Sequence, residues 1–215
     1  GIQHVRLGNF EEAAQCFQDA IEENPNEPLR FVNFGNLLAM TGEYEQSLRC
    51  FERALELDDG LATAYYGAGN VFYNIEQFKD AKEMYQKAMQ SGMADSDVFY
   101  MIGMTSYRLW EPLRALPHFQ RVIELTDGDV DAYFYYGMCL AHLGNVDEAI
   151  RQFEKVLQLN PAHADAYFNY GVSLLSKKKP QKAYHMFEKA LEIQPDHLLA
   201  ANGKKQIEST FQNDR

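Results

Sequence analysis

Apolar residues recur along the chain at spacings of three and four, which is the period of an α-helix. Between Tyr133 and Leu140 the large side chains fall on one helical face, and Ala149 and Phe153 continue the same pattern further along. Gly144 stands between the two stretches and can adopt the conformation that reverses the chain. The pattern therefore predicts two packed helices joined by a short turn.

This helix pair repeats with a period of 34 residues. A glycine column stands at Gly1, Gly35, Gly69, Gly103, Gly137 and Gly171. A column of small residues follows at Ala13, Ser47, Ala81, Ala115, Ala149 and Ala183. An aromatic column comes four residues later, at Phe17, Phe51, Tyr85, Phe119, Phe153 and Phe187. Small residues let two helix backbones approach closely and aromatic rings fill the groove beside them, so we expect the copies to stack side by side.

These columns resemble those of the tetratricopeptide-repeat (TPR) family, in particular its small stand-alone bacterial members. The resemblance implies an all-α fold, a right-handed α-solenoid (an α-α superhelix) of TPR helix-turn-helix repeats. We expect one array over residues 1–215. It would comprise a partial repeat at 1–27, complete repeats at 28–61, 62–95, 96–129, 130–163 and 164–197, and a C-terminal capping helix at 198–215.

The composition excludes several classes of partner. The chain has 20 Lys and Arg against 31 Asp and Glu, a formal net charge of -11. Nucleic acids and anionic membrane surfaces are recognised chiefly by basic side chains, so neither is expected as a partner. A run of 18 apolar residues is absent, so we expect no membrane insertion. Three cysteines are too few for a disulfide scaffold and favour a reducing, cytoplasmic location.

Motifs that carry chemistry are also missing. The sequence has no HExxH, Cys-x-x-Cys, GxGxxG or GxxxxGK[ST] pattern, so we expect no enzymatic activity, no metal and no cofactor. Most of the histidines, among which His163 and His197 share one slot in successive copies, are expected to be solvated loop or surface residues. Cys16 and Cys50 also share a slot. Equivalent points on stacked copies lie about 8–10 Å apart, beyond disulfide reach, so we expect two small buried thiols.

The family resemblance further implies a concave groove lined by the first helix of each copy. Once the core columns are removed, the inward positions carry asparagine, aromatic and methionine side chains, which suit an extended peptide. The residues predicted to bind, called the groove set below, are Asn33, Asn36, Tyr66, Asn70, Tyr73, Tyr100, Met104, Tyr107, Arg108, Phe134, Met138 and Asn169. Alternatively, the tyrosines only stabilise the packing between neighbouring copies.

An acidic column, Asp97, Asp131 and Asp165, falls near the start of three first helices. Its members either stabilise the helix N-termini or form an acidic rim that prefers a basic or N-terminal segment of a partner. Many eukaryotic family members instead hold a peptide carboxylate with Lys and Arg. The corresponding slots here hold Val32, Tyr66, Gly67 and Tyr100. Basic peptides are therefore the expected ligands.

The fourth copy departs from the pattern, because Trp110 replaces the turn glycine and Pro117 falls inside the second helix. We expect Pro117 to kink this helix, as a local bend or as a hinge between copies. Trp110 either anchors a partner or covers the junction between helix and turn.

The expected function is a protein-protein interaction scaffold or adaptor that binds a peptide or protein segment in the concave groove. One alternative is a regulatory or targeting region of a larger enzyme, since the first copy lacks its opening seven positions. The other is a chaperone-like assembly factor that shields apolar segments on the methionine and aromatic floor.

Overall fold

The computed structural model describes the backbone of residues 1–213 and the side chains of residues 1–211. Residues 214–215 of the predicted capping helix lie outside this range. Within it the chain is helical, with no strand among these residues. The chain divides into two compact units, the first comprising Gly1–Leu109 and the second beginning at Trp110.

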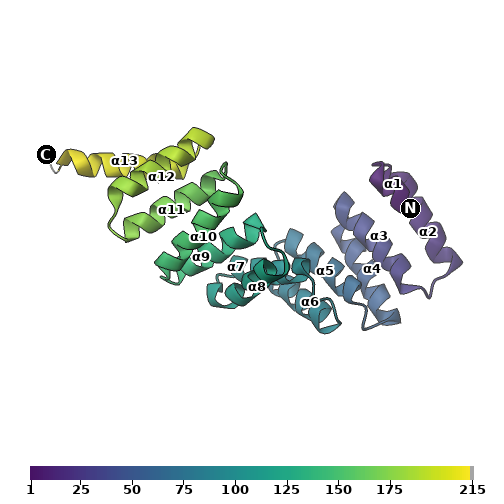
Figure 1. The fold of residues 1–215 in the computed structure, drawn as a ribbon. Helices are drawn as coiled ribbons and strands as arrows, with labels where there is room; N and C mark the ends of the chain where they lie inside the picture. The colour runs from purple at the N-terminus through teal and green to yellow at the C-terminus, as the bar shows by residue number, and fades with distance from the viewer. Residues whose placement is uncertain (214–215) are drawn as a thin grey trace. The chain divides into compact units, whose positions relative to one another are not determined.

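The helices follow one another through short turns in both units (Figure 1). The first unit contains α1 (Ile2–Arg6), α2 (Phe10–Glu23), α3 (Pro28–Thr41), α4 (Tyr44–Leu57), α5 (Ala62–Asn74), α6 (Phe78–Gln90) and α7 (Ser96–Arg108). The second unit contains α8 (Pro112–Leu125), α9 (Val130–His142), α10 (Val146–Leu159), α11 (Ala164–Ser176), α12 (Pro180–Ile193) and α13 (Leu198–Asn213). No helix among the residues described is long and apolar enough to cross a membrane.

Consecutive helices pack in pairs, and the pairs stack. In the first unit α3 packs on α4 and α5 on α6, and in the second unit α9 packs on α10 and α11 on α12. The second helix of a pair also contacts the first helix of the next pair, as α4 does with α5 and α10 with α11. Successive first helices meet as well, α3 with α5 and α9 with α11. The predicted all-α stack of helix pairs is confirmed within each unit.

The glycine column is required by the aromatic column. A β-carbon placed on Gly69 would lie 2.7 Å from Cε1 of Tyr85, and one on Gly171 would lie 2.6 Å from Cε1 of Phe187. Real β-carbons are essentially never found so close to another heavy atom. The ring of the second helix therefore rests directly on the backbone of the first helix, which explains why glycine recurs with the period of the helix pair.

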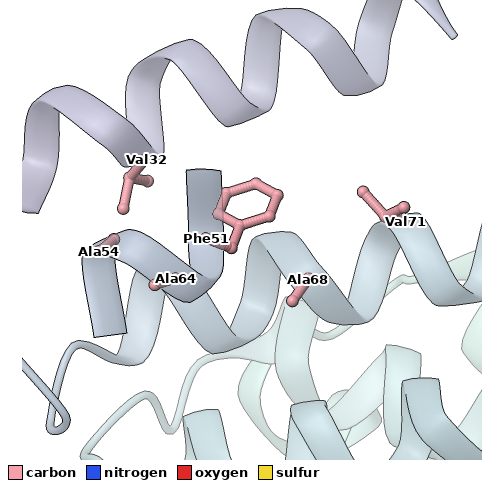
Figure 2. Packing of buried hydrophobic residues seen from close by; sticks show 6 residues of the cluster. All are labelled: Val32, Phe51, Ala54, Ala64, Ala68 and Val71. Atoms are coloured by element: carbon pink, nitrogen blue, oxygen red, sulfur yellow. The ribbon is translucent and has the colours of Figure 1, made fainter. Parts of the chain in front are cut away.

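One ring also joins two neighbouring pairs, as the core of the first unit shows. Figure 2 shows the Phe51 ring of α4 between Val32 of α3 and the small side chains Ala64 and Ala68 of α5. Val32 and Phe51 are buried, and burial of such a side chain contributes about 1.5–3 kcal/mol. Since the Phe51 ring packs on residues of both pairs, the stacking of copies completes this part of the core.

The turns within the helix pairs share one backbone conformation. The left-handed φ occurs at 34-residue intervals, at Gly8, Gly42, Glu76, Trp110, Gly144 and Lys178. Trp110 has a φ of 58°, so it adopts the glycine conformation of the equivalent turns and does not change the turn. Helix α8 then runs without interruption from Pro112 to Leu125 with Pro117 inside it. The missing N–H of one proline removes only one hydrogen bond of the helix, and the helix continues past it.

Candidate functional site

The groove set lies on the helices α3, α5, α7, α9 and α11. In the first unit α3 carries Asn33 and Asn36, α5 carries Tyr66, Asn70 and Tyr73, and α7 carries Tyr100, Met104, Tyr107 and Arg108. In the second unit α9 carries Phe134 and Met138, and α11 carries Asn169. Asn36 and Arg108 are exposed and most of the others are half-buried, so their side chains are partly accessible to a partner.

Met104 is the exception, and the expectation that it forms a binding floor is wrong. This residue is only 8% exposed. It lies in a run of α7 that is buried from Ile102 to Ser106, including Gly103 and Thr105. Because α7 is buried on several faces, Met104 is inaccessible, although it occupies the position in its repeat that Asn70 occupies one copy earlier. Met104 therefore belongs to the core.

Asn70 is the centre of a polar cluster in the first unit. The Tyr85 hydroxyl donates to Asn70 Oδ1 at 2.7 Å, and the Tyr66 ring lies 5.5 Å from the Tyr85 ring. Burial, followed by the carboxylates of Asp97 and Asp95, raises the pKa of Tyr66, whereas its hydrogen bond with Asn70 lowers that pKa. Burial also raises the pKa of Tyr85. Both phenols therefore remain protonated at neutral pH, and the Tyr85 hydroxyl is the donor to Asn70.

Arg108 is held by contacts within the first unit. Its guanidinium carbon lies 4.7 Å from the centre of the Phe78 ring, and its Nη2 lies 3.7 Å from Oε1 of Glu76. The edge of Tyr73 packs on the same Phe78 ring, with 5.4 Å between the ring centres. Arg108 therefore contributes a charge that Glu76 partly neutralises, and its role toward a partner stays a prediction.

In the second unit Phe134 and Asn169 make equally specific contacts. The Phe134 ring stacks on the imidazole of His163, with 4.8 Å between the ring centres and 29° between the planes. Asn169 donates from Nδ2 to the backbone oxygen of Asp165 at 2.8 Å, one turn earlier in α11. One amide hydrogen of Asn169 is thus used within its own helix, while Oδ1 is an acceptor that this bond does not use.

The acidic column was expected near the helix starts, and each of its residues is the second residue of its helix. Asp97, Asp131 and Asp165 are exposed residues in the first turns of α7, α9 and α11. The N-caps stand two residues earlier. Asp95 accepts from the Val98 N–H at 3.0 Å, Asp129 from the Ala132 N–H at 2.8 Å, and His163 Nδ1 from the Ala166 N–H at 3.2 Å.

These caps were not foreseen, although an aspartate two residues before each acidic position is a recognisable signal for the first two. With the caps assigned elsewhere, the acidic column retains its favourable interaction with the helix dipoles. Its carboxylates are not needed to satisfy the first backbone N–H groups. The acidic rim therefore stays available as a hypothesis for partner recognition.

His163 and His197, at the starts of α11 and α13, are exceptions to the expectation that most histidines are solvated loop or surface residues. His197 is 7% exposed, its Nδ1 accepts from the Ala200 N–H at 3.2 Å, and its ring centre lies 5.1 Å from that of Phe168. His163 is half-buried. The segment before a first helix packs against the preceding first helix, so an imidazole there both caps and packs.

Metal ligands and thiols are the remaining chemically reactive groups among the residues described. No group of three or more His, Cys, Asp or Glu side chains that could hold a metal ion occurs within the residues described. Cys16, Cys50 and Cys139 are free thiols, the first two half-buried and the third buried. Burial raises the pKa of Cys50 to about 11 and that of Cys139 to about 12. Both thiols are therefore protonated, and poor nucleophiles, at neutral pH.

Two open depressions of about 500 Å³ each have no member of the groove set among their lining residues. One, in the first unit, is lined by Gln18, Ile21, Glu22, Phe31, Phe34 and Cys50. The other, in the second unit, is lined by Leu175, Lys178, Pro180, Gln206, Ile207 and Thr210. Trp110 is 80% exposed, and its ring centre lies 5.8 Å from that of His142. Its role as a partner anchor stays a prediction.

Comparison with known proteins agrees with this arrangement. Family models of the tetratricopeptide repeat match residues 4–27, 29–91, 130–163 and 164–197. Among solved structures, the chain is similar to YrrB, described as a TPR protein with an unusual peptide-binding site. The two are 48% identical over 90% of this chain and 100% of YrrB, with a TM-score of 0.85.

Two MamA structures share the fold. One is 23% identical over 80% of this chain and 93% of its own, with a TM-score of 0.74. The other, from Desulfovibrio magneticus RS-1, is 18% identical over 80% of this chain and 97% of its own, with a TM-score of 0.75. No curated protein sequence matches the chain. The family models and the likeness to YrrB establish that the chain belongs to the tetratricopeptide-repeat family.

Proposed function

We propose that this chain, an interaction scaffold of the tetratricopeptide-repeat family, binds an extended segment of a partner protein through the groove set without Met104. The observation that carries the proposal is the row of partly accessible Asn and Tyr side chains on α3 and α5. The helix backbones are already hydrogen-bonded internally, so these side chains supply the polar contacts. The likeness to YrrB, which is described as having a peptide-binding site, supports the same assignment.

The chemistry of the groove set suits a polypeptide better than a compact small molecule. An extended peptide has unpaired N–H and C=O groups along its length, and an asparagine amide can donate to one and accept from the other. Tyr66 and Tyr73 add rigid apolar surface with a polar end, which costs little conformational entropy on binding. The Met104 side chain takes no part, since it is buried.

We further assign a basic character to the bound segment. The chain has a formal net charge of -11, and the exposed carboxylates of Asp97 and Asp131 stand at the starts of α7 and α9. Such a field attracts cationic segments and accelerates their association, and salt weakens both effects. Three free thiols favour a reducing compartment, so we place the scaffold in the cytoplasm.

The test begins with affinity capture on the intact chain, followed by measurement of the dissociation constant of each purified partner. The groove variant combines Asn33→Ala, Asn36→Ala and Asn169→Ala. Alanine favours the helix more than asparagine does, so this variant is expected to fold. The control combines Gln46→Ala and Gln158→Ala, which change exposed amides on the second helices α4 and α10.

We expect the groove variant to weaken partner binding about tenfold or more, because each lost hydrogen bond costs about 0.5–1.5 kcal/mol and about 1.4 kcal/mol corresponds to a tenfold change. The control variant is expected to bind as the unchanged protein does. A partner that binds both variants with unchanged affinity would show that another surface, such as one of the two depressions, is used.

A further inference from the structure

Tyr85 departs from the aromatic column in one atom. Its slot holds phenylalanine in the other copies, at Phe17, Phe51, Phe119, Phe153 and Phe187. Tyr85 is 0% exposed, so its hydroxyl is carried into the core. A buried hydroxyl needs a hydrogen-bond partner, and this one reaches Asn70 Oδ1 at 2.7 Å. The extra oxygen therefore connects the core of the first unit to a member of the groove set.

This bond fixes which way the Asn70 amide faces. Oδ1 is occupied by Tyr85, and the side chain of Asn70 also hydrogen-bonds to that of Tyr66. Because Tyr85 donates to Oδ1, the amide nitrogen of Asn70 is the group that bonds to Tyr66, and the Tyr66 oxygen accepts from it. Hydrogen-bond donation then runs in one direction, from Tyr85 to Asn70 and from Asn70 to Tyr66.

An amide nitrogen carries two hydrogens. One hydrogen of Asn70 Nδ2 serves Tyr66, so the second is left to donate to a ligand. A carboxylate ligand is disfavoured here, because Asp97 and Asp95 act on the same cluster. The acceptor that remains is a neutral oxygen, and the neutral oxygen that recurs along an extended peptide is the backbone carbonyl.

The equivalent position one copy earlier lacks this arrangement. Asn36 shares the slot of Asn70, but the aromatic residue of its own pair is Phe51, which has no hydroxyl. Asn36 is exposed, so its amide can turn to present either the oxygen or the nitrogen. The amide of Asn36 can therefore rotate, whereas the amide of Asn70 is held in one orientation.

We propose that Tyr85 is a positioning residue that holds Asn70 as a hydrogen-bond donor, so that this part of α5 recognises a backbone carbonyl of the bound segment. The proposal rests on the proposed function for its ligand. The fixed orientation of Asn70 does not depend on any ligand and can be tested without one.

The first experiment measures that orientation. In isotope-labelled protein, the side-chain amide of Asn70 is expected to show a nuclear Overhauser effect to the Tyr66 ring. Tyr85→Phe restores the residue found in the other copies, so the fold should persist, as circular dichroism would verify. Loss of the Overhauser effect in Tyr85→Phe is the expected result, and Tyr184→Phe, which removes a surface hydroxyl bonded to Glu208, is the control. If the effect survives in Tyr85→Phe, the proposal is overturned whether or not a peptide binds.

The second experiment measures binding of a fluorescent, C-terminally amidated peptide of alternating lysine and alanine at low salt. One hydrogen bond corresponds to about a 2–10-fold change in affinity, which is the loss expected for Tyr85→Phe. Asn70→Ala should lose as much, and the double variant should lose no more than Asn70→Ala alone. Additive losses would contradict a role through Asn70. If the unchanged protein does not bind the peptide, the basic-peptide function fails, while the Overhauser effect still decides the role of Tyr85.

Discussion

Nε2 of His197 lies 3.2 Å from Oδ1 of Asp165, which joins the start of α13 to the first turn of α11. The other ring nitrogen of His197 accepts the backbone N–H of Ala200. With Nδ1 accepting, the ring hydrogen is on Nε2 and is donated to Asp165. The buried His197 side chain therefore caps α13 and also hydrogen-bonds to Asp165 of the acidic column.

His197→Ala should lower the free energy of unfolding by about 1–3 kcal/mol, because it removes an N-cap and leaves a cavity. His197→Asn is the matched variant, since asparagine is a good N-cap but has no second ring nitrogen to hydrogen-bond to Asp165. We expect it to recover part of the loss in urea denaturation. Equal losses in the two variants would show that the cap contributes nothing.

The three aspartates of the acidic column should differ in how much they contribute to binding a basic ligand. Asp97→Asn and Asp131→Asn are each expected to weaken binding of the lysine-alanine peptide up to about fivefold at low salt, with the difference vanishing at high salt. Asp165→Asn should do less to binding, because His197 already hydrogen-bonds to this carboxylate. Fluorescence titration at several salt concentrations checks this. Asp80→Asn, on α6, makes the same charge change on the second helix of a pair. An equal effect of this variant would show that the net charge of the chain, and not the position of the acidic column, attracts the peptide.

The left-handed turn position carries a cost wherever it lacks glycine. Lys178 has a φ of 57° and is exposed, so Lys178→Gly should raise the free energy of unfolding by about 0.5–1 kcal/mol. Gly144, which occupies the same turn position one copy earlier with a φ of 80°, gives the reverse test. Gly144→Ala should lower stability by a similar amount. Chemical denaturation measures both, and opposite signs would disprove the role assigned to this turn.

The sequence predicted the features that depend on one helix pair. The contact of Gly171 with Phe187 joins residues sixteen apart on adjacent helices, so it recurs with every copy and appears as columns. The sequence did not predict features that depend on the surroundings of one copy. Met104 and Asn70 share a slot, yet only Met104 is buried, because its burial is decided by the packing around α7. The contact of Arg108 with Phe78 likewise joins two helices through the rotamer of a long side chain, which a column does not encode.

The glycine column should tolerate no β-carbon. A methyl group on Gly171 would approach Cε1 of Phe187 to 2.6 Å and the backbone oxygen of Ala183 to 3.2 Å, so Gly171→Ala is expected to cost about 1–3 kcal/mol. Gly60→Ala is the control, because its β-carbon would meet only a side-chain atom of Asp58 at 3.5 Å. Thermal unfolding of the two variants measures the difference. A Gly171→Ala protein as stable as the unchanged one would mean that the aromatic ring does not rest on this backbone.

The buried thiol of Cys139 makes stability fall in alkaline solution. Burial raises the pKa of this thiol from its ordinary value of 9.0 to about 12, so the folded state holds the proton more tightly than the unfolded state does. Because the folded state binds this proton more tightly, the contribution of Cys139 to the free energy of unfolding is fully present below pH 9 and is lost progressively as the pH rises toward 12. Cys139→Ala removes the titrating group and should flatten the decline measured by urea denaturation between these limits. The half-buried Cys50 also has a raised pKa, so the variant should retain a smaller slope. An identical decline in the unchanged protein and Cys139→Ala would assign the alkaline loss to other groups, such as the buried phenol of Tyr85.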